Sequence, residues 1–201
     1  IDKTAKRSVD EEIIIRLKEL ELKDMPTLQF TRDLFLFSYC TRGMSFVDIA
    51  YLRRKDIRNS YICYTRKKTG HSLSVRIECE VQKIINRYWN ATAGTPFLFP
   101  ILHTEDEELS YKQYQTGLRY YNKQLKKLAS LLGEDIVLTS YTSRHTWAST
   151  ARKHNVPVAV ISDGMGHTSE KTTLIYLSSI DTSVIDRANA ELVASLNRKS
   201  E

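Results

Sequence analysis

Two short segments decide the interpretation of this chain: TSRHTWA at residues 142–148 and GMGH at residues 164–167, with Tyr176 nine residues beyond the histidine. They place Arg144, His167 and Tyr176 in a fixed order within one short stretch. The planar fork of arginine can engage two phosphate oxygens at once, histidine can donate to the same oxygens, and a tyrosine oxygen can attack phosphorus. Each residue type alone is more often structural, but the ordered set indicates chemistry on a phosphodiester.

Length and composition indicate one globular domain. The 201 residues are enough for one well-formed core, 41% of them are hydrophobic, and no apolar run approaches the length of a membrane span. The sequence begins at Ile1 without a signal-peptide pattern, and we expect it to be the C-terminal part of a longer protein. Its three cysteines, Cys40, Cys63 and Cys79, are scattered and favour a reduced, cytoplasmic setting.

Positive charge is concentrated in one segment of the chain. The net charge is +6, and residues 53–68 carry seven basic side chains against the single acid Asp56, an excess of seven minus one that equals the total. Such a patch favours a polyanionic partner, with nucleic acid as the first candidate, and a merely solvated basic surface is the alternative. The seven residues are Arg53, Arg54, Lys55, Arg58, Arg66, Lys67 and Lys68.

Hydrophobic periodicity predicts a mainly α fold with a small antiparallel β-hairpin. The first helix is expected through Ile13–Leu20, after a capping box of Ser8 and Glu11. The hairpin pairs residues 61–65 with 73–77 around a turn at Gly70. The remaining helices are expected over residues 27–40, 45–52, 81–88, 110–132, 140–154, 157–164, 171–177 and 183–196.

The long helix at 110–132 has two distinct faces. Its apolar stripe predicts core positions at Tyr111, Tyr114, Leu118, Tyr121, Leu125 and Leu128. Its cationic stripe suits phosphates along a DNA groove, or else solvent, and consists of Lys112, Arg119, Lys123 and Lys126.

The late motifs and the hairpin together resemble the tyrosine recombinases, also called phage-type integrases, over nearly the whole chain. The resemblance implies the catalytic-domain fold of that family, mainly α with a small antiparallel sheet (α+β), over residues 1–201. The N-terminal domain that clamps DNA in the family would lie outside this sequence. The segment TRGMSFVDI at 41–49 is similar to integrases of mobile elements in Bacteroides-like bacteria.

This resemblance implies roles for individual residues. Tyr176 corresponds to the nucleophile, Arg144 and His167 to the phosphate-binding pair, and Lys68 to the general acid. Arg66 or Lys67 could replace Lys68, because a shift of one residue along a strand turns the side chain to the other face.

Two positions depart from the family pattern. Tyr141 occupies the place of a histidine; tyrosine can donate to a phosphate oxygen but is a poor proton acceptor near neutral pH. Ser45 occupies the place of the first arginine. We expect Arg42, three residues earlier, to replace it, with Arg32 as the second choice.

The implied activity is site-specific DNA recombination through a 3′-phosphotyrosine intermediate, in the bacterial cytoplasm at the nucleoid. It needs no metal, ATP or other cofactor, and the scattered histidines lack ligand spacing. Integration or excision of a mobile element, DNA inversion and chromosome-dimer resolution are alternatives within the family. A catalytically impaired DNA-binding module is the alternative from another class.

The implied partners are double-stranded DNA and further copies of the chain, forming a tetramer on DNA. The last helix, 183–196, is expected to dock on a neighbouring protomer or on its own core. The residues expected to contact DNA are Arg53, Arg54, Lys67, Lys112, Arg119, Lys123 and Lys126.

Overall fold

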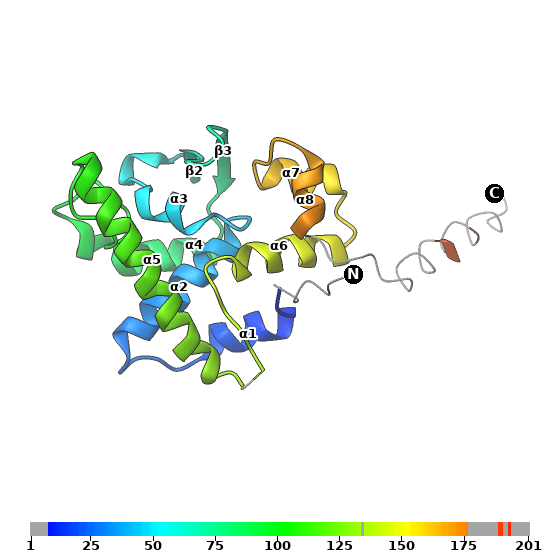
Figure 1. Cartoon of the computed structure of the whole chain (residues 1–201), viewed down its shortest axis with the longest axis horizontal. Coiled ribbons are helices and arrows are strands. Elements are labelled where there is room, and N and C mark those ends of the chain that lie inside the picture. The colour runs from blue at the N-terminus through cyan, green and yellow to red at the C-terminus, as the bar shows by residue number, and fades with distance from the viewer. Residues whose placement is uncertain (1–7, 134, 177–188, 191–192, 194–201) are drawn as a thin grey trace.

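Helices form most of the structure, and a small antiparallel sheet lies at one edge (Figure 1). The computed structural model describes residues 8–133, 135–176, 189–190 and 193. Within these residues the predicted fold class is confirmed; the predicted helix 183–196 lies almost wholly outside them. The elements run in the order α1 (Glu11–Glu19), α2 (Pro26–Cys40), α3 (Phe46–Tyr51), η1 (Arg54–Asp56), β1 (Ile57–Arg58), β2 (Tyr61–Thr65), β3 (Ser72–Arg76), α4 (Cys79–Trp89), η2 (Asn90–Thr92), α5 (Glu107–Ser130), α6 (Thr142–Lys153), α7 (Val158–Gly164) and α8 (Glu170–Tyr176).

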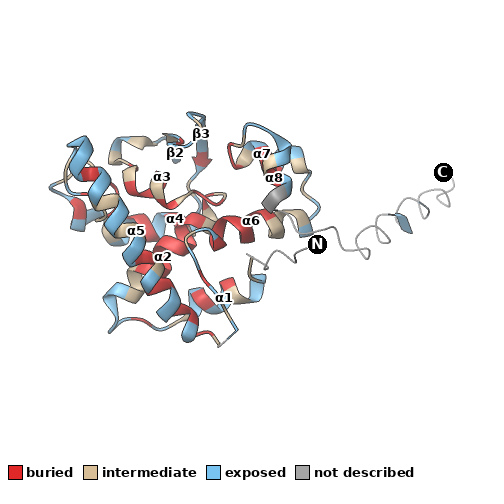
Figure 2. Cartoon of the chain, in the orientation of Figure 1, coloured by how far each residue is buried: buried red, intermediate tan, exposed pale blue. Residues whose placement is uncertain are grey.

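Helix α2 is the centre of the fold. It packs against α1, α4, α5 and α6, so that it is covered on several sides (Figures 1 and 2). Consecutive residues 34–37, Leu-Phe-Leu-Phe, are therefore all buried, which a helix with one solvated face would not allow. Full burial of each of these side chains contributes about 1.5–3 kcal/mol. In the described part of the chain, no helix combines the length and apolarity that crossing a membrane requires.

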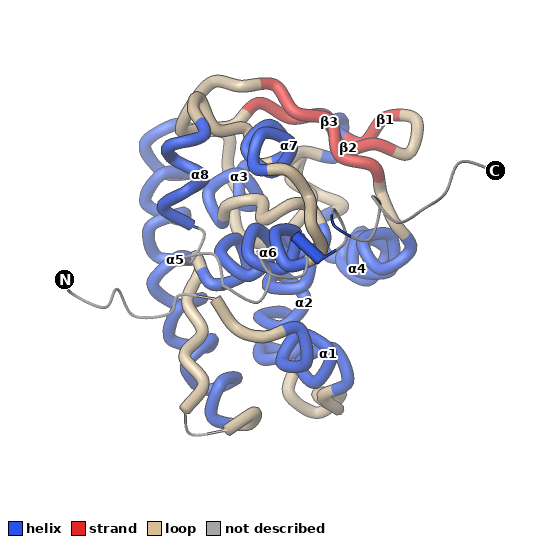
Figure 3. Tube along the Cα trace, turned by 90° about the vertical axis from the view of Figure 1, so that its right-hand side faces the viewer, coloured by secondary structure: helices blue, strands red, loops and turns tan. Residues whose placement is uncertain are grey.

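The sheet has three antiparallel strands in the order β1-β2-β3 and lies above the helical core (Figure 3). Ile62 pairs with Val75, and both are buried, while their neighbours alternate outward as the pleat requires. The turn contains Gly70 at φ +69°, a left-handed conformation that glycine adopts without strain. Strand β1 was not predicted from the sequence, because a strand of two residues is too short to show the alternation of buried and exposed side chains.

Two details of the sequence-based prediction are wrong. Helix α1 begins at Glu11 with Asp10 at its N-cap and without a side-chain cap bond, so the capping box of Ser8 is absent. Tyr111 was predicted in the core but is 53% exposed. The first turns of α5 extend beyond the helices that cover its later turns, and only from Tyr121 onward is its apolar stripe buried (Figure 2).

A buried carboxylate ties α2 to its neighbours. Asp33 is 1% exposed and accepts hydrogen bonds from the guanidinium of Arg32 at 3.1 Å, from the hydroxyl of Tyr88 at 2.7 Å and from Arg87. Arg32 also donates to the carbonyl of Leu20 at 2.6 Å. The guanidinium of Arg32 is thus held by Asp33 and Leu20, and its role as the second choice for the first arginine stays a prediction.

We expect Asp33→Ala to lower the free energy of unfolding by about 3–5 kcal/mol, since it leaves the buried cation of Arg32 without its carboxylate. Equilibrium urea denaturation measures this change. The control Asp24→Ala removes an exposed carboxylate and should change stability by less than about 0.5 kcal/mol. Equal effects of the two substitutions would contradict a structural role for the cluster.

Candidate active site

The loop between α2 and α3 lies directly against helix α6. Gly43 has φ +71°, and a Cβ atom added to it would stand 2.8 Å from the Cα of Arg144. Two hydrogen bonds of Ser38 in α2 accompany this contact. Its hydroxyl forms a hydrogen bond of 2.7 Å with the hydroxyl of Ser143, and its backbone carbonyl accepts from the backbone N–H of Gly43 at 2.8 Å. Glycine is therefore required here both by conformation and by the close approach of two backbones.

Arg144 is 3% exposed, and its guanidinium joins three segments of the chain. Nη1 donates to the carbonyl of Gly43 at 2.7 Å, and Nη2 lies 2.8 Å from both the carbonyl of Met165 and Nε2 of His167. The structure thus brings Arg144 and His167 together, as the sequence predicted. Fixed donors of this kind are suited to an anionic group because they need no reorganisation when it binds.

His167 is half-buried and linked to helix α8. Its Nδ1 lies 2.8 Å from the hydroxyl of Thr173. Burial, together with the positive charges of Arg144, Arg66 and Lys68, lowers the pKa of His167 to about 4, so the ring is neutral at pH 7. Tyr176 is the last residue of α8; its side chain lies outside what the structure describes.

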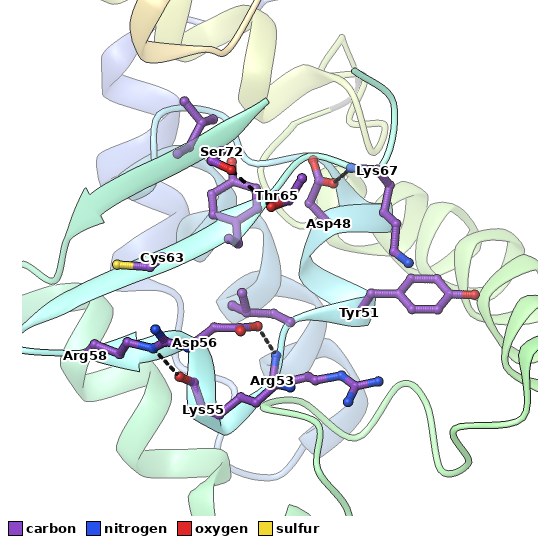
Figure 4. Close-up of a pocket in the computed structure, with 13 residues that line it drawn as sticks. Asp48, Tyr51, Arg53, Lys55, Asp56, Arg58, Cys63, Thr65, Lys67 and Ser72 are labelled. Atoms are coloured by element: carbon purple, nitrogen blue, oxygen red, sulfur yellow. Dashed lines mark hydrogen bonds between the residues drawn. The ribbon is translucent and has the colours of Figure 1, made fainter. Parts of the chain in front are cut away.

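The three basic residues at the end of β2 have separate environments. Arg66 is 5% exposed and donates to the carbonyl of Gly166 at 2.7 Å, with Nε 3.7 Å from the carboxylate of Asp48. Lys67 places its ammonium 4.2 Å from the ring centre of Tyr51 (Figure 4). Lys68 is exposed, and its charge acts on His167. This division favours Lys68 over its two neighbours as the hairpin lysine of the site.

Arg42 lies close to the same centre. It is half-buried at φ +61°, and its Cδ is 3.6 Å from where a Cβ on Gly164 would stand. The pKa of the Tyr64 hydroxyl reflects the charges around it. Burial raises this pKa and the charge of Asp48 raises it further, whereas the positive charges of Arg144, Arg66 and Arg42 lower it. The charges of three arginines therefore act on Tyr64, and Arg42 stays the predicted substitute for the missing first arginine.

The two departures from the family pattern have different surroundings. Ser45 is the N-cap of α3, and its hydroxyl donates to Asp48 at 2.6 Å. Tyr141 precedes α6 by one residue and is 58% exposed, one turn before Arg144. Its ring is on the surface, and its role in phosphate binding remains a prediction.

A basic pocket of about 430 Å³ lies beside the hairpin, between η1, β2 and α3 (Figure 4). Arg53, Lys55, Arg58 and Lys67 line it together with Asp48 and Asp56. Two of the predicted DNA-contacting residues, Arg53 and Lys67, therefore share one hollow.

The other predicted DNA-contacting residues lie elsewhere. Arg54 packs 4.3 Å over the ring of Trp89 and donates to Thr92 at 2.9 Å, away from the basic pocket. The four residues of the cationic stripe on α5 are all exposed, and Lys112 forms a salt bridge with Glu108. The exposed set is Lys112, Arg119, Lys123 and Lys126.

Sequence reasoning missed the residues that hold the site in place. Asp48 accepts hydrogen bonds from Ser45 and from the backbone of Lys67, at 2.6 and 2.8 Å, and so anchors the hairpin to α3. Thr173 is fully buried beside His167. A single carboxylate or hydroxyl carries no periodic signal, and these contacts join residues that are distant in sequence or on separate elements.

Comparison with known proteins identifies the family and the fold of this chain. The model of the phage integrase family matches residues 18–182. The XerA recombinase structure superposes with a TM-score of 0.63 at 18% identity, over 96% of this chain and 66% of that one. XerH site-specific recombinase bound to its palindromic difH substrate superposes with a TM-score of 0.65 at 16% identity, over 92% of this chain and 52% of that one. A lambda integrase dimer bound to a COC′ core site superposes with a TM-score of 0.61 at 17% identity, over 87% of this chain and 60% of that one. No curated protein sequence matches the chain.

These findings establish the class of protein. A mainly helical domain with a small antiparallel sheet, matching recombinase structures over most of its length, has the tyrosine recombinase catalytic fold. The chain belongs to the phage integrase family. It spans between about half and two thirds of the length of the three solved structures compared with it above.

The contact at Gly43 is testable with a matched control. Gly70 has nearly the same φ, +69° against +71°, but a Cβ there would meet nothing within 4 Å. We expect Gly70→Ala to lower the free energy of unfolding by about 1–2 kcal/mol through backbone strain alone. Gly43→Ala should cost a further 1–3 kcal/mol or so, because the loop must move away from α6. If Gly43 did not lie so close to α6, urea denaturation would show the same loss of unfolding free energy for Gly43→Ala and Gly70→Ala.

Proposed function

We propose that this chain is the catalytic domain of a site-specific DNA recombinase that cleaves and rejoins strands through a 3′-phosphotyrosine intermediate. The observation that carries the proposal is the contact of buried Arg144 with His167, beside the helix that ends in Tyr176 and within range of the charge of Lys68. Family membership supports the same chemistry.

In the proposed mechanism, the phenol oxygen of Tyr176 attacks a backbone phosphorus. The bond from phosphorus to the 5′-oxygen breaks, Lys68 gives a proton to the departing oxygen, and the phenol proton leaves for water, because the Nε2 lone pair of His167 already accepts from Arg144. Arg144, with Arg42 in place of the missing first arginine, stabilises the charge on the non-bridging oxygens, at about 3 kcal/mol for each well-placed donor. Tyr141 is proposed to add a hydrogen bond to the same oxygens.

Rejoining follows from the energy conserved in the intermediate. The phosphotyrosine bond retains the energy of the phosphodiester, so the 5′-hydroxyl of another strand can displace Tyr176 without ATP or a metal ion. Strand exchange requires two such events on paired DNA sites, and a tetramer on DNA is the proposed assembly. The segment 183–196 is proposed to dock on a neighbouring protomer in that assembly.

The proposed DNA interface follows basic residues at the surface. Arg53 and Lys67 in the basic pocket, Arg54 and the four residues of the cationic stripe on α5 would neutralise phosphates, which makes binding sensitive to salt. The circular intermediate DNA in a structure of the Tn1549 transposon integrase supports DNA as the partner.

Mobile-element integration or excision is the proposed biological role. The segment at 41–49, similar to integrases of Bacteroides-like mobile elements, supports it, as does the match to the Tn1549 transposon integrase, with a TM-score of 0.61 at 16% identity over 96% of this chain and 68% of that one. Inversion and dimer resolution use the same domain. A DNA-binding module without cleavage is the second candidate, because Ser45 and Tyr141 replace two residues of the family pattern.

Covalent trapping tests the proposal. The protein, in its full-length form, is incubated with a nicked DNA that carries the element's own crossover site and is then run on a denaturing gel. We expect a DNA-linked band that disappears in Tyr176→Phe, because that variant keeps the ring but lacks the attacking oxygen. Clear DNA binding without any adduct would overturn the recombinase proposal and favour the binding module.

A second experiment separates Lys68 from Lys67. Lys68→Ala should slow cleavage by about 10²–10⁴-fold, as expected for loss of a general acid, whereas Lys67→Ala should change mainly DNA affinity. Sulfur in place of the bridging 5′-oxygen should restore cleavage by Lys68→Ala, since a thiol with a pKa of about 8.5 leaves without a proton. If the sulfur substrate restored cleavage only in Lys67→Ala, the general acid would be Lys67 and not Lys68.

A further inference from the structure

Both ring nitrogens of His167 have a side-chain neighbour at hydrogen-bond distance. Nε2 lies 2.8 Å from Nη2 of Arg144, and Nδ1 lies 2.8 Å from Oγ1 of Thr173. Thr173 is fully buried in α8, and Arg144 is 3% exposed in α6. The histidine therefore connects two helices that carry different parts of the proposed catalytic set.

The chemistry of these neighbours determines where the histidine proton lies. A guanidinium nitrogen can only donate, so Nε2 must accept from Arg144 with its lone pair. A neutral imidazole carries one N–H, and that hydrogen must then lie on Nδ1. Nδ1 donates, and the hydroxyl oxygen of Thr173 accepts.

The charges around the ring agree with a neutral tautomer. The groups that act on His167 from α6 and from the hairpin are Arg144, Arg66 and Lys68, and all three are cations. Together with burial they disfavour an imidazolium ring. The hydrogen on Nδ1 is thus the one ring proton available, and Thr173 is its acceptor.

We propose that Thr173 is a positioning residue of the active site: its hydroxyl accepts from Nδ1–H and so fixes the orientation in which the Nε2 lone pair of His167 meets Arg144. The inference deepens the proposed function and rests on it for its catalytic meaning. Without the hydroxyl, Nδ1–H would lose its acceptor, and the ring would turn to bring that N–H to water or to another oxygen. The Arg144–His167 contact would then be lost, and with it the constraint that keeps the proton on Nδ1, so the Nε2–H form would gain population.

The position of Thr173 explains why this matters for catalysis. Tyr176 follows Thr173 by three residues, about one turn of α8. A helix of seven residues is too short to be stable alone, so tertiary contacts decide where it lies. The hydrogen bond from His167 to Thr173 is such a contact, and it links the helix of the proposed nucleophile to the guanidinium that binds phosphate.

The first test is spectroscopic and needs no DNA. Two-bond ¹H–¹⁵N correlation spectra of the ¹⁵N-labelled protein at neutral pH distinguish the two neutral tautomers of His167. We expect the Nδ1–H form in the wild type and in Thr173→Ser, and a shift toward the Nε2–H form in Thr173→Val. Thr172→Val, a change of the adjacent threonine whose hydroxyl lies near Ser169, should leave the tautomer unchanged. An Nε2–H ring in the wild type would overturn the inference even if Thr173→Val failed to fold.

The second test uses the covalent adduct as its readout. Thr173→Val should reduce the rate of adduct formation by about 10- to 100-fold, the usual loss when the orienting partner of a functional histidine is removed. Thr173→Ser should restore the rate, and Thr172→Val should retain it. Equal rates for Thr173→Val and wild type would overturn the positioning role. Absence of adduct in the wild type, with the Nδ1–H tautomer present, would reject the proposed function and leave the hydrogen-bond assignment intact.

Discussion

The rest of the site depends on the buried guanidinium of Arg144. Its donors reach the loop before α3 and the segment 165–167 after α7, so two stretches of chain converge on one cation of α6. A buried charge is tolerated only where it is compensated by hydrogen bonds or an opposite charge. The carbonyls of Gly43 and Met165 supply part of this compensation and at the same time fix the direction in which the guanidinium points.

Around this cation the fold gathers further positive charge, with the carboxylate of Asp48 close to Arg66. Arg42, Arg66 and Arg144 all act on Tyr64, and Asp48 holds the hairpin by accepting from the backbone of Lys67. A concentration of cations in a partly buried place destabilises the free protein and favours an anionic ligand. The arrangement is therefore a compromise in which Asp48 and Asp33 stabilise the scaffold while the site itself remains electropositive.

The hairpin shows how neighbouring residues of one type acquire different functions. Arg66, Lys67 and Lys68 are consecutive, yet the first is buried against Gly166, the second lies over Tyr51, and the third acts on His167. All three residues follow β2, which ends at Thr65, so the turn of the hairpin directs their side chains. Basic composition predicted a polyanion partner, but only the fold of this turn and its neighbours assigns each cation its environment.

The sequence by itself determined the element types, because the periodicity of residues 27–40 and 61–77 is a local property, and it determined the order of Arg144, His167 and Tyr176 along the chain. The tertiary structure decided what could not be local. It showed that Arg32 belongs to the Asp33 cluster, that Arg42 lies beside Gly164, that Tyr111 is exposed and that Thr173 lies at hydrogen-bond distance from His167. Each of these outcomes depends on which element packs against which, and no pattern within one segment records that.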